Sequence, residues 1–404
     1  MRASRATLYP PDGAGSSVAG PPPRGRPVML AAGGTGGHLF PAEALARELL
    51  ARNVPVVLVT DRRGKAFGDA LPSVPVHRVA AATLLPGLMG KLRTLGLLTL
   101  GTIEAKRLIG RLKPSVVVGF GGYPSLPAVM AARLAGVPVV LHEQNAVLGR
   151  ANRLMVRGVR KLAVSFPLVS GLPDCCRDLV VRTGNPVRPG VAAVRDAFYM
   201  PPGDDGPIRL LVMGGSQGAR IFSEVVPAAL ARLPAALRAR LVVSQQCRPE
   251  DLDGARAAYD GLGVGGLDLQ SFFRDVPARL AGAHLVVCRA GASTMAELTA
   301  VGRPAILVPY PFATDDHQTA NAGALAQAGG AWLMPQPEFT AETLAARLAS
   351  LLAQPSDLAL AAAVSRGWSI LDAAARLAEI VIEIAHGAGS GVNGNHRQAW
   401  EAAE

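Results

Sequence analysis

The sequence predicts an α/β fold built from two Rossmann-like domains, each with a parallel sheet. Strand and helix patterns alternate along the 404 residues, and this alternation is what a parallel sheet requires. A strand that enters a glycine-rich loop and then a helix occurs at the start of each half, at residue 27 and again at residue 208. The length also suffices for two domains with separate cores.

The first half of the chain shows strands and helices in regular succession. Pro27–Ala32 is a predicted strand that enters the loop Gly33-Gly34-Thr35-Gly36-Gly37-His38, and a helix over Leu39–Ala51 follows. A second glycine loop, Gly119–Ser125, opens a helix that ends near Leu134. The other strands expected here are Val56–Thr60, Ser115–Gly119 and Pro138–Leu141, the last of which leads into His142-Glu143-Gln144-Asn145.

The pattern restarts in the second half. Ile208–Met213 is a predicted strand that enters a third glycine loop, Gly214–Arg220, and Ala283–Val287 is a predicted strand before a helix that ends near Ala300. Ser356–Ala385 is helical in pattern and long enough to cross back to the first domain. The predicted divisions are a disordered extension (1–26), a first domain (27–187), a second domain (188–355), returning helices (356–386) and a flexible tail (387–404).

The formal net charge of +11 predicts an acidic partner. Nucleic-acid surfaces interleave aromatic with basic residues, but the two basic groups of this chain contain no aromatic residue. Because their basic residues lie among aliphatic ones, they favour an anionic bilayer surface over nucleic acid. Ordinary amphipathic helices packed on a core are the alternative. The two groups are Lys91, Arg93, Lys106, Arg107, Arg111 and Lys113, with leucines between them, and Arg150, Arg153, Arg157, Arg160 and Lys161.

Cysteine usage and the N-terminal composition indicate a protein of the reducing cytoplasm. The four cysteines include the adjacent pair Cys175 and Cys176, which is unsuited to a disulfide, and no Cys/His spacing suggests a metal site. Met1–Arg26 lacks the apolar segment of a signal peptide. No apolar run approaches the ~18 residues of a membrane span, so we expect a protein that is soluble or lies on a membrane surface.

The segment Cys288–Glu297 has chemistry suited to a sugar nucleotide. Small residues let a ligand approach the backbone, Ser293 and Thr294 leave amides free at a helix N-terminus, and the Glu297 carboxylate can accept two ribose hydroxyls. A second polar run, Asp315–Asn321, follows the next strand, and ligands of open α/β sheets gather at that edge. Simple packing is the alternative for each segment, but together they are typical of a nucleotide-sugar glycosyltransferase.

Three glycine loops suggest two phosphorylated ligands, one for each domain, because backbone amides and a helix dipole converge at such loops. A nicotinamide enzyme is the competing interpretation. Its G-x-G-x-x-G fingerprint fails in the first loop, where Leu39 stands at the position of the third glycine. Asp61 ends the second strand as in NAD enzymes, but Arg62 and Arg63 follow it.

Six motifs in order resemble the MurG family of glycosyltransferases. The resemblance extends over roughly Pro27 to Ala385 and includes both domains. The motifs are Gly33-Gly34-Thr35-Gly36-Gly37-His38, Gly121-Gly122-Tyr123-Pro124-Ser125, His142-Glu143-Gln144-Asn145, Thr183-Gly184-Asn185-Pro186-Val187-Arg188, Gly214-Gly215-Ser216-Gln217-Gly218-Ala219 and Arg289–Glu297.

The resemblance implies a GT-B fold and an inverting transfer of GlcNAc from UDP-GlcNAc. The acceptor would be the C4 hydroxyl of MurNAc in undecaprenyl-diphosphate-MurNAc-pentapeptide, so the reaction would turn lipid I into lipid II in peptidoglycan synthesis. No cofactor or metal is expected, because helix dipoles and side chains would stabilise the departing UDP. The expected location is the cytoplasmic face of the plasma (inner) membrane, as a peripheral protein with cell-wall synthesis and division proteins as partners.

The resemblance also assigns site residues. The N-terminal domain would hold the acceptor and face the membrane, and the C-terminal domain would bind UDP-GlcNAc. The donor residues would be Thr35, Gly36, Gly37, Asn145, Arg188, Ser216, Phe273, Ala292, Ser293, Thr294, Glu297 and Gln318. Gly34, Gly121, Gly122, Tyr123 and Ser125 would hold the acceptor diphosphate. The expected membrane contacts are Leu88, Lys91, Leu92, Arg93, Leu95 and Lys106.

His38 is the candidate catalytic base, since it ends the first glycine loop at the cleft and an imidazole can accept a proton near neutral pH. A histidine that only caps the helix is the alternative, and Glu143 and His142 are competing bases. His317 stands where some relatives carry a glutamine. Other UDP-sugar GT-B proteins, such as a natural-product glycosyltransferase or a UDP-GlcNAc epimerase, and a membrane-surface scaffold without turnover are the remaining alternatives.

Overall fold

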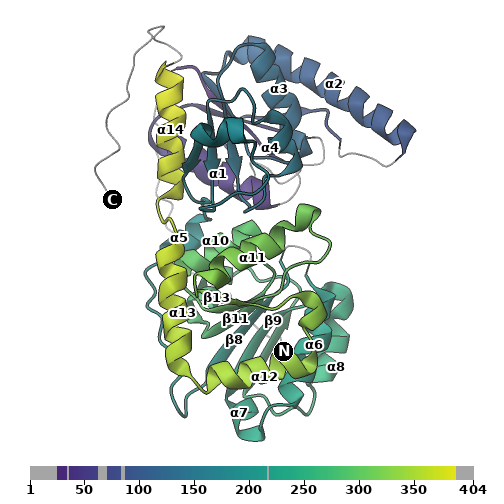
Figure 1. The fold of residues 1–404 in the computed structure, drawn as a ribbon, viewed down its shortest axis with the longest axis vertical. Coiled ribbons are helices and arrows are strands. Elements are labelled where there is room, and N and C mark those ends of the chain that lie inside the picture. Colours follow the sequence, from purple (N-terminus) through teal and green to yellow (C-terminus); the bar gives the residue numbers. More distant parts are fainter. Residues whose placement is uncertain (1–24, 34–35, 62–70, 83–86, 216–217, 388–404) are drawn as a thin grey trace, which may run out of the picture.

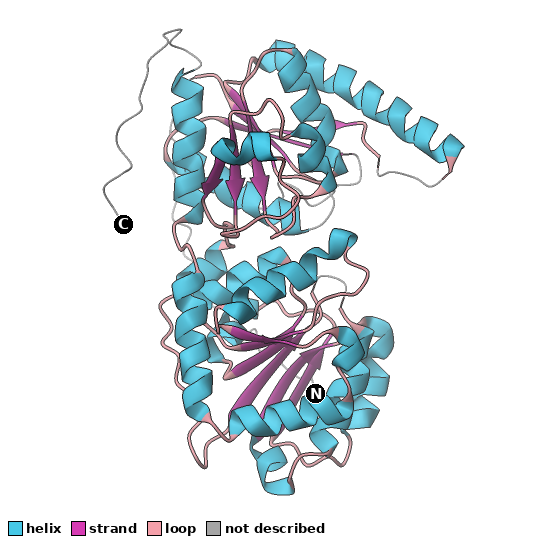
Figure 2. Ribbon diagram, viewed as in Figure 1, coloured by secondary structure: helices cyan, strands magenta, loops and turns pink. Residues whose placement is uncertain are grey.

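The structure, a computed structural model, describes residues 25–33, 36–61, 71–82, 87–215 and 218–387. Two parallel sheets organise these residues, and they lie in separate halves of an elongated molecule (Figures 1 and 2). Helices cover both faces of each sheet, as parallel sheets require, because their crossover connections place helices there. The predicted α/β fold with two Rossmann-like domains is therefore confirmed.

The first sheet has the strand order β3-β2-β1-β4-β5-β6-β7. Alternate residues of β1 enter different cores, with Val28 and Leu30 on one face and Met29 and Ala31 on the other. Both faces are buried, which explains why the strands read as continuous apolar runs. The strands are β1 (Val28–Ala31), β2 (Val56–Asp61), β3 (Val76–Val79), β4 (Val116–Gly119), β5 (Val139–Glu143), β6 (Lys161–Val164) and β7 (Val180–Arg182).

Helices from distant parts of the chain cover the first sheet. α1 (Gly36–Ala51) packs on one face beside α14 (Ala373–Gly387), whose Leu377 and Val381 are fully buried there. α2 (Leu88–Leu112) and α3 (Leu126–Leu134) cover the other face. Shorter helices follow near the strand ends: η1 (Tyr123–Ser125), α4 (Arg150–Met155) and η2 (Asp174–Leu179).

The second sheet has the order β10-β9-β8-β11-β12-β13. Its strands are β8 (Ile208–Met213), β9 (Leu241–Gln246), β10 (Gly266–Gln270), β11 (Leu285–Cys288), β12 (Ala305–Leu307) and β13 (Ala331–Leu333). One face packs against α6 (Arg220–Ala231), α8 (Leu252–Tyr259) and α12 (Ala341–Leu352). The other packs against α9 (Val276–Gly282), α10 (Ala292–Val301) and α11 (His317–Gln327). The remaining short helices are α7 (Ala235–Arg240), η3 (Pro249–Asp251), η4 (Thr314–Asp316) and η5 (Gln336–Glu338).

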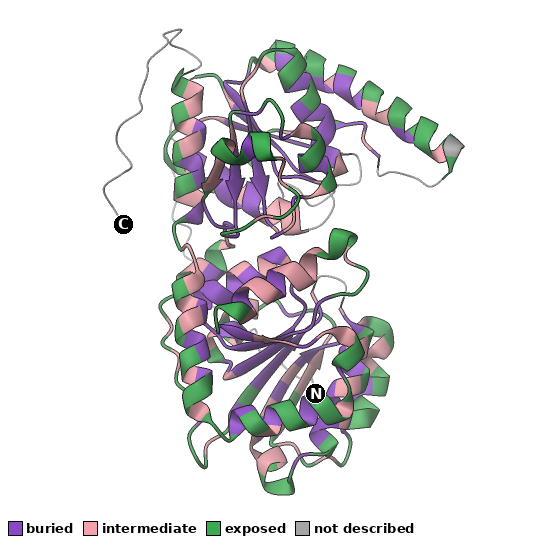
Figure 3. Cartoon of the chain, in the orientation of Figure 1, coloured by how far each residue is buried: buried purple, intermediate pink, exposed green. Residues whose placement is uncertain are grey.

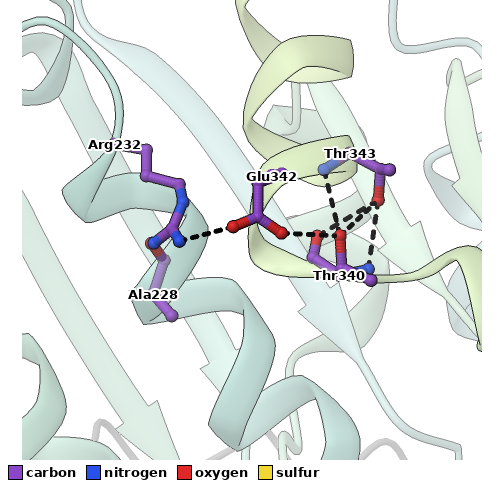
Figure 4. Close-up of polar contacts among 5 residues, drawn as sticks. All are labelled: Ala228, Arg232, Thr340, Glu342 and Thr343. Atoms are coloured by element: carbon purple, nitrogen blue, oxygen red, sulfur yellow. Dashed lines mark hydrogen bonds and ion pairs between the residues drawn. The ribbon is translucent and has the colours of Figure 1, made fainter.

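A reciprocal cap fixes the start of α12 against the second sheet (Figure 4). The Thr340 hydroxyl accepts a hydrogen bond from the Thr343 amide at 3.2 Å, and the Thr343 hydroxyl accepts one from the Thr340 amide at 3.1 Å. Arg232 of the loop after α6 donates to Glu342 at 2.7 Å. The cap satisfies backbone groups that a helix start leaves free, so α12 begins at a defined place.

The chain passes between the domains twice. It first leaves β7 through Thr183–Val187 into α5 (Pro189–Ala193), and it returns where α13 (Pro355–Trp368) ends and α14 begins. The two passages touch, because a Cβ added to Gly184 would lie 2.7 Å from Cβ of Ile370. Gly184 also has φ +81°, so glycine is required there on both counts. Figure 1 shows α13 and α14 running along the same side of the two domains.

α2 projects beyond the first domain (Figure 1), and much of this helix is exposed (Figure 3). Met89, Leu92 and Ile103 are 79%, 56% and 45% exposed, whereas Ala105 and Ile109 are buried against the sheet. Within the described part of the chain, no single helix is long and apolar enough to cross a membrane. One bent pair, Ala341–Leu352 with Pro355–Gly387, meets the length and composition test across a 94° bend.

Some predictions concern parts that the structure does not describe. The extension (1–26) and the tail (387–404) lie outside the described residues except for Gly25, Arg26 and Gly387. Arg26 donates to the carbonyls of Lys113 and Pro114, at 2.8 and 3.1 Å. The domain boundaries stay predictions, with β7 ending at Arg182 and β8 beginning at Ile208 on either side of the first one.

Candidate active site

A cavity of about 240 Å³ lies between the domains, where strand ends of the first sheet face the second domain. His38, Tyr123 and Glu143 line it from the first domain, and Thr314, Asp315 and His317 line it from the second. Parallel strands place their carboxyl ends, and the helix starts that follow, at one edge of a sheet. The cavity therefore joins three predicted motifs of the first domain to the polar run at the start of α11.

The backbone of Gly121 and Gly122 forms the wall opposite His38. Both glycines have positive φ, +82° and +71°, which L-residues with side chains rarely adopt. A Cβ at Gly122 would lie 3.2 Å from Cδ2 and 3.4 Å from Nε2 of His38. These glycines thus leave the free edge of the imidazole open to the cavity.

The other edge of the His38 ring is bound to a buried polar chain. Nδ1 of His38 lies 2.8 Å from Oε1 of Gln144, and Nε2 of Gln144 lies 2.8 Å from Nδ1 of His142. His142 donates from Nε2 to the carbonyl of Gly184 at 3.0 Å. Complete burial lowers the pKa of His142 to about 4, since desolvation of the charged form outweighs that hydrogen bond. His142 is therefore a neutral, buried ring rather than a base facing the cavity.

Glu143 holds the segment that follows β5 in place through hydrogen bonds of its carboxylate. It is 2% exposed, and its two oxygens accept hydrogen bonds from four groups. Oε1 accepts from the Asn145 amide at 3.1 Å and its side chain at 3.3 Å, while Oε2 accepts from the Gly149 amide at 2.9 Å and Asn152 at 2.8 Å. A carboxylate whose lone pairs are occupied in this way is poorly suited to accept a proton from a ligand.

Asn321 of α11 joins the two domains beneath the cavity. Its Oδ1 accepts from the Ala146 amide at 2.8 Å, and its Nδ2 donates to Oδ1 of Asn145 at 3.1 Å and to the Ala290 carbonyl at 2.9 Å. The side chain is fully buried, so these bonds are not exchanged with water. At the surface, Arg150 pairs with Asp315 at 2.8 Å and lowers the pKa of that carboxyl, chiefly through the hydrogen bond.

The donor residues predicted near α10 lie together. Gly291 occupies the N-cap position of α10 and offers no side-chain acceptor to the first-turn amides, which include those of Ser293 and Thr294. Arg188 binds Glu297, in the next turn of α10, through two hydrogen bonds, Nε to Oε1 at 2.6 Å and Nη2 to Oε2 at 2.8 Å. The guanidinium also lies 5.1 Å from the centre of the Phe40 ring, two residues after His38.

The Arg188–Glu297 pair is partly shielded from water, with side-chain exposures of 33% and 9%. Burial alone would lower the pKa of Arg188, but the hydrogen bonds and charge of Glu297 raise it above its ordinary value. The arginine is thus charged at all relevant pH values. Both groups assigned to the donor are therefore engaged with each other in this structure.

Several predicted residues have other contacts. Phe273 is 3% exposed with the Arg279 guanidinium 4.0 Å from its ring centre, so its ring does not face an open site, and only a backbone role remains as a prediction. Ser125 is buried and donates to the Gly122 carbonyl at 2.9 Å, which shapes the loop. Gln318 accepts from the Tyr310 amide at 3.0 Å through Oε1. Gly34, Thr35 and Ser216 lie outside the described residues, as does the side chain of Leu88.

Sequence reasoning assigned no role to Gln144, Asn152 or Asn321. All three lie in or near the polar runs that follow β5 and β12, so their location near the site could be read from the sequence. Their hydrogen-bond partners could not. In the described residues, no group of three or more His, Cys, Asp or Glu side chains could hold a metal ion.

Two facing parallel-sheet domains, with a polar cavity and a helix N-terminus between them, define a glycosyltransferase of the GT-B class. Residues 28–164 match the N-terminal domain of glycosyltransferase family 28, and residues 209–377 match its C-terminal domain. The chain belongs to this family and, within it, to the MurG family.

Known proteins support this assignment. A relative from Rhodospirillum centenum is 61% identical over 90% of this chain and 96% of its own length, and one from Paramagnetospirillum magneticum is 56% identical over 88% and 96%. Both are named UDP-N-acetylglucosamine–N-acetylmuramyl-(pentapeptide) pyrophosphoryl-undecaprenol N-acetylglucosamine transferase. The crystal structure of Acinetobacter baumannii MurG superposes with a TM-score of 0.73 at 30% identity, over 89% of this chain and all of that one.

A structure of UDP-GlcNAc 2-epimerase from Neisseria meningitidis shares the fold alone, with a TM-score of 0.61 at 12% identity over 88% of this chain and all of that chain. The epimerase alternative therefore receives support only at the level of the fold.

The buried His142 predicts a pH dependence of stability. Below pH 6.5 the unfolded chain protonates this residue, whereas the native protein does not until about pH 4, so stability is lost as the pH falls through this window. A pKa lowered from 6.5 to about 4 corresponds to about 3 kcal/mol of stability. Urea unfolding of wild type and His142→Gln at several pH values checks this, because the difference between the two curves isolates His142 from other groups. Parallel curves between pH 6.5 and 4 would contradict it.

Proposed function

We propose that this protein transfers GlcNAc from UDP-GlcNAc to the C4 hydroxyl of MurNAc in undecaprenyl-diphosphate-MurNAc-pentapeptide, with inversion at the sugar carbon, during peptidoglycan synthesis. The observation that carries the proposal is the interdomain cavity, which His38 lines from the first domain and Thr314, Asp315 and His317 line from the second. The Arg188–Glu297 pair lies on the second-domain side of Phe40, which follows His38 in α1 by two residues. The names of the relatives identify which sugar and acceptor such a site serves.

The reaction requires one displacement. The acceptor oxygen bonds to C1 of GlcNAc from the face opposite the diphosphate, the bond between C1 and the phosphate oxygen breaks, and its electron pair leaves with UDP. His38 takes the hydroxyl proton on its open edge, and a single displacement of this kind inverts the sugar carbon. The amides at the start of α10 and the guanidinium of Arg188 stabilise the negative charge on UDP.

The geometry supports His38 over Glu143 as the base. His38 has one ring edge free toward the cavity, while the Glu143 oxygens already accept four hydrogen bonds. Asn145 and Gln318 are the proposed GlcNAc contacts, with Thr35, Gly36 and Gly37 near the sugar and Ser216 at the diphosphate. Gly34, Gly121, Gly122 and Tyr123 are the proposed cradle for the acceptor diphosphate, and Ser125 supports the shape of that loop.

The docking surface is the outer face of α2. Met89, Leu92, Leu95, Leu100 and Ile103 are exposed along the helix, and Lys91, Arg93, Lys106 and Arg107 are exposed among them. Aliphatic side chains with flanking cations suit the headgroup region of an anionic bilayer. The lipid tail of the acceptor cannot leave the bilayer cheaply, since each exposed CH₂ costs about 0.8 kcal/mol. We therefore propose a peripheral position on a membrane surface and, from the family resemblance, on the cytoplasmic face of the plasma (inner) membrane.

Transfer of radiolabelled GlcNAc from UDP-GlcNAc to a lipid I analogue tests the function, with other sugar acceptors as controls. We expect His38→Ala to lower turnover about 10²–10⁴-fold while donor affinity changes little, since a positioned base contributes on this scale. Transfer by the wild type to unrelated sugars but not to the lipid I analogue would refute the proposed acceptor. Near-normal turnover of His38→Ala would instead refute the assignment of the base.

Measurement of UDP-GlcNAc binding tests the proposed role of Glu297 as the partner of the ribose hydroxyls. We expect Glu297→Ala to weaken UDP-GlcNAc binding by about 1.5–3 kcal/mol, the scale of hydrogen bonds to a charged group, as measured by calorimetry. Glu224→Ala is the matched control, because Glu224 also pairs with an arginine, Arg220 at 2.6 Å, but is half exposed on α6. Equal affinities of wild type and Glu297→Ala would show that another group holds the ribose.

Liposome binding tests the docking surface. Each Lys or Arg near anionic lipid is worth about 1 kcal/mol, so replacing Lys91, Arg93 and Lys106 with glutamine should weaken binding strongly, and salt should weaken it in wild type. A control with Arg232, Arg256 and Arg347 replaced loses the same charge from the second domain. Binding to neutral liposomes that is as tight as to anionic ones, or equal losses in both variants, would place the surface elsewhere.

A further inference from the structure

The polar chain behind His38 has a defined direction. A carbonyl oxygen can only accept, so the contact between Nε2 of His142 and the Gly184 carbonyl at 3.0 Å places the His142 proton on Nε2. Nδ1 of the neutral His142 ring must then accept. The full burial of His142, which lowers its pKa to about 4, keeps the ring neutral and this arrangement intact at neutral pH.

His142 determines the orientation of the Gln144 amide. Nδ1 of His142, as an acceptor, needs a donor, and the Gln144 NH₂ group supplies it at 2.8 Å. The same NH₂ group donates to the His142 carbonyl at 3.0 Å, so two acceptors hold the nitrogen on this side. Gln144 is 1% exposed, and water does not compete for these bonds. The Gln144 oxygen consequently faces His38.

We infer that Gln144 is the positioning residue of the candidate base: its oxygen holds the proton of His38 on Nδ1 and so leaves the lone pair of Nε2 free for the acceptor hydroxyl. The 2.8 Å contact between Nδ1 and Oε1 fits this role, and Nε2 lies on the open edge beside Gly122. An imidazole with its proton on Nε2 would present a donor, not a base, to the cavity. The inference rests on His38 being the base of the proposed function.

Other charged groups near His38 leave this role to Gln144. Tyr123, Glu143, Arg150, Asp315 and His317 line the same cavity, and His142 lies behind Gln144. Glu143 is occupied by its four hydrogen bonds, and Asp315 is paired with Arg150, whose hydrogen bond lowers the pKa of the carboxyl. The His317 Nδ1 contacts the Thr314 carbonyl at 2.7 Å. Among the described residues, Gln144 is the hydrogen-bond partner of the His38 ring, through Nδ1.

Nitrogen NMR of the whole protein labelled with ¹⁵N-histidine tests the inference without substrate. Protonated and unprotonated ring nitrogens resonate in separate regions, and His38→Gln and His142→Gln identify the two residues among the seven histidines. We expect neutral His38 with its proton on Nδ1 and neutral His142 with its proton on Nε2. A neutral His38 with its proton on Nε2 overturns the inference, whatever the turnover of His38→Ala.

Two variants test the consequence for turnover. Gln144→Met removes the acceptor for Nδ1, and we expect kcat to fall at least about tenfold with KM nearly unchanged. Positioning is one part of the 10²–10⁴-fold that a general base contributes in all. Gln144→Glu keeps an acceptor and adds a charge that favours the imidazolium, so the acid limb of the kcat/KM profile should move to higher pH. Gln245→Met is the matched control, since Gln245 is also fully buried but lies in β9 of the second domain.

The outcomes separate the possible failures. A purely structural Gln144 would lower the stability of Gln144→Met, as in Gln245→Met, and would leave kcat of the folded variant near that of wild type; this result overturns the inference. If His38→Ala retains turnover while the NMR signals are as expected, the base assignment fails but the direction of the hydrogen-bond chain stands. If a Gln144 variant does not fold, the wild-type NMR result decides.

Discussion

In each sheet all paired strands run in one direction, and every candidate site residue depends on this constraint. The carboxyl ends of the strands meet at one edge, and the glycine loops and helix starts after β1, β4, β8 and β11 lie there. The first backbone amides of a helix have no partner inside the helix, so such helix starts can bind anionic groups. The cavity joins this edge of the first sheet to the start of α11 in the second domain.

The two edges form one site because buried amides join them. Asn321 binds the backbone of Ala146 and Ala290 and the side chain of Asn145, so a single fully buried residue links β5 of the first domain to α11 and the β11 loop of the second. Glu143 fixes the same loop from below through Asn145, Gly149 and Asn152. Each of these groups is satisfied inside the protein, and breaking one would leave a buried polar atom unpaired at a cost of about 1–3 kcal/mol.

The sequence allowed the fold to be predicted and a candidate site to be proposed at the strand ends, because apolar runs, glycine loops and polar strand ends are local patterns. It did not allow the direction of side chains to be predicted. Phe273 and Phe272 are adjacent and chemically alike, yet the first is 3% and the second 62% exposed. Gln144 looked like part of a motif, but its role depends on contacts with residues on α1 and with a neighbour whose proton is fixed by Gly184. Such partners come from tertiary packing, which one sequence does not encode as a pattern.

The bidentate contact between Arg188 and Glu297 has a consequence for selectivity under the proposed donor assignment. In this structure each charge of the pair neutralises the other. A ligand that offers only phosphates would take Arg188 and leave the 9% exposed Glu297 carboxylate alone, which is costly for a shielded charge. A nucleoside diphosphate also brings a ribose diol to that carboxylate. The pair therefore discriminates against free inorganic phosphates and pyrophosphate, which are abundant in a cell, without any group that repels them.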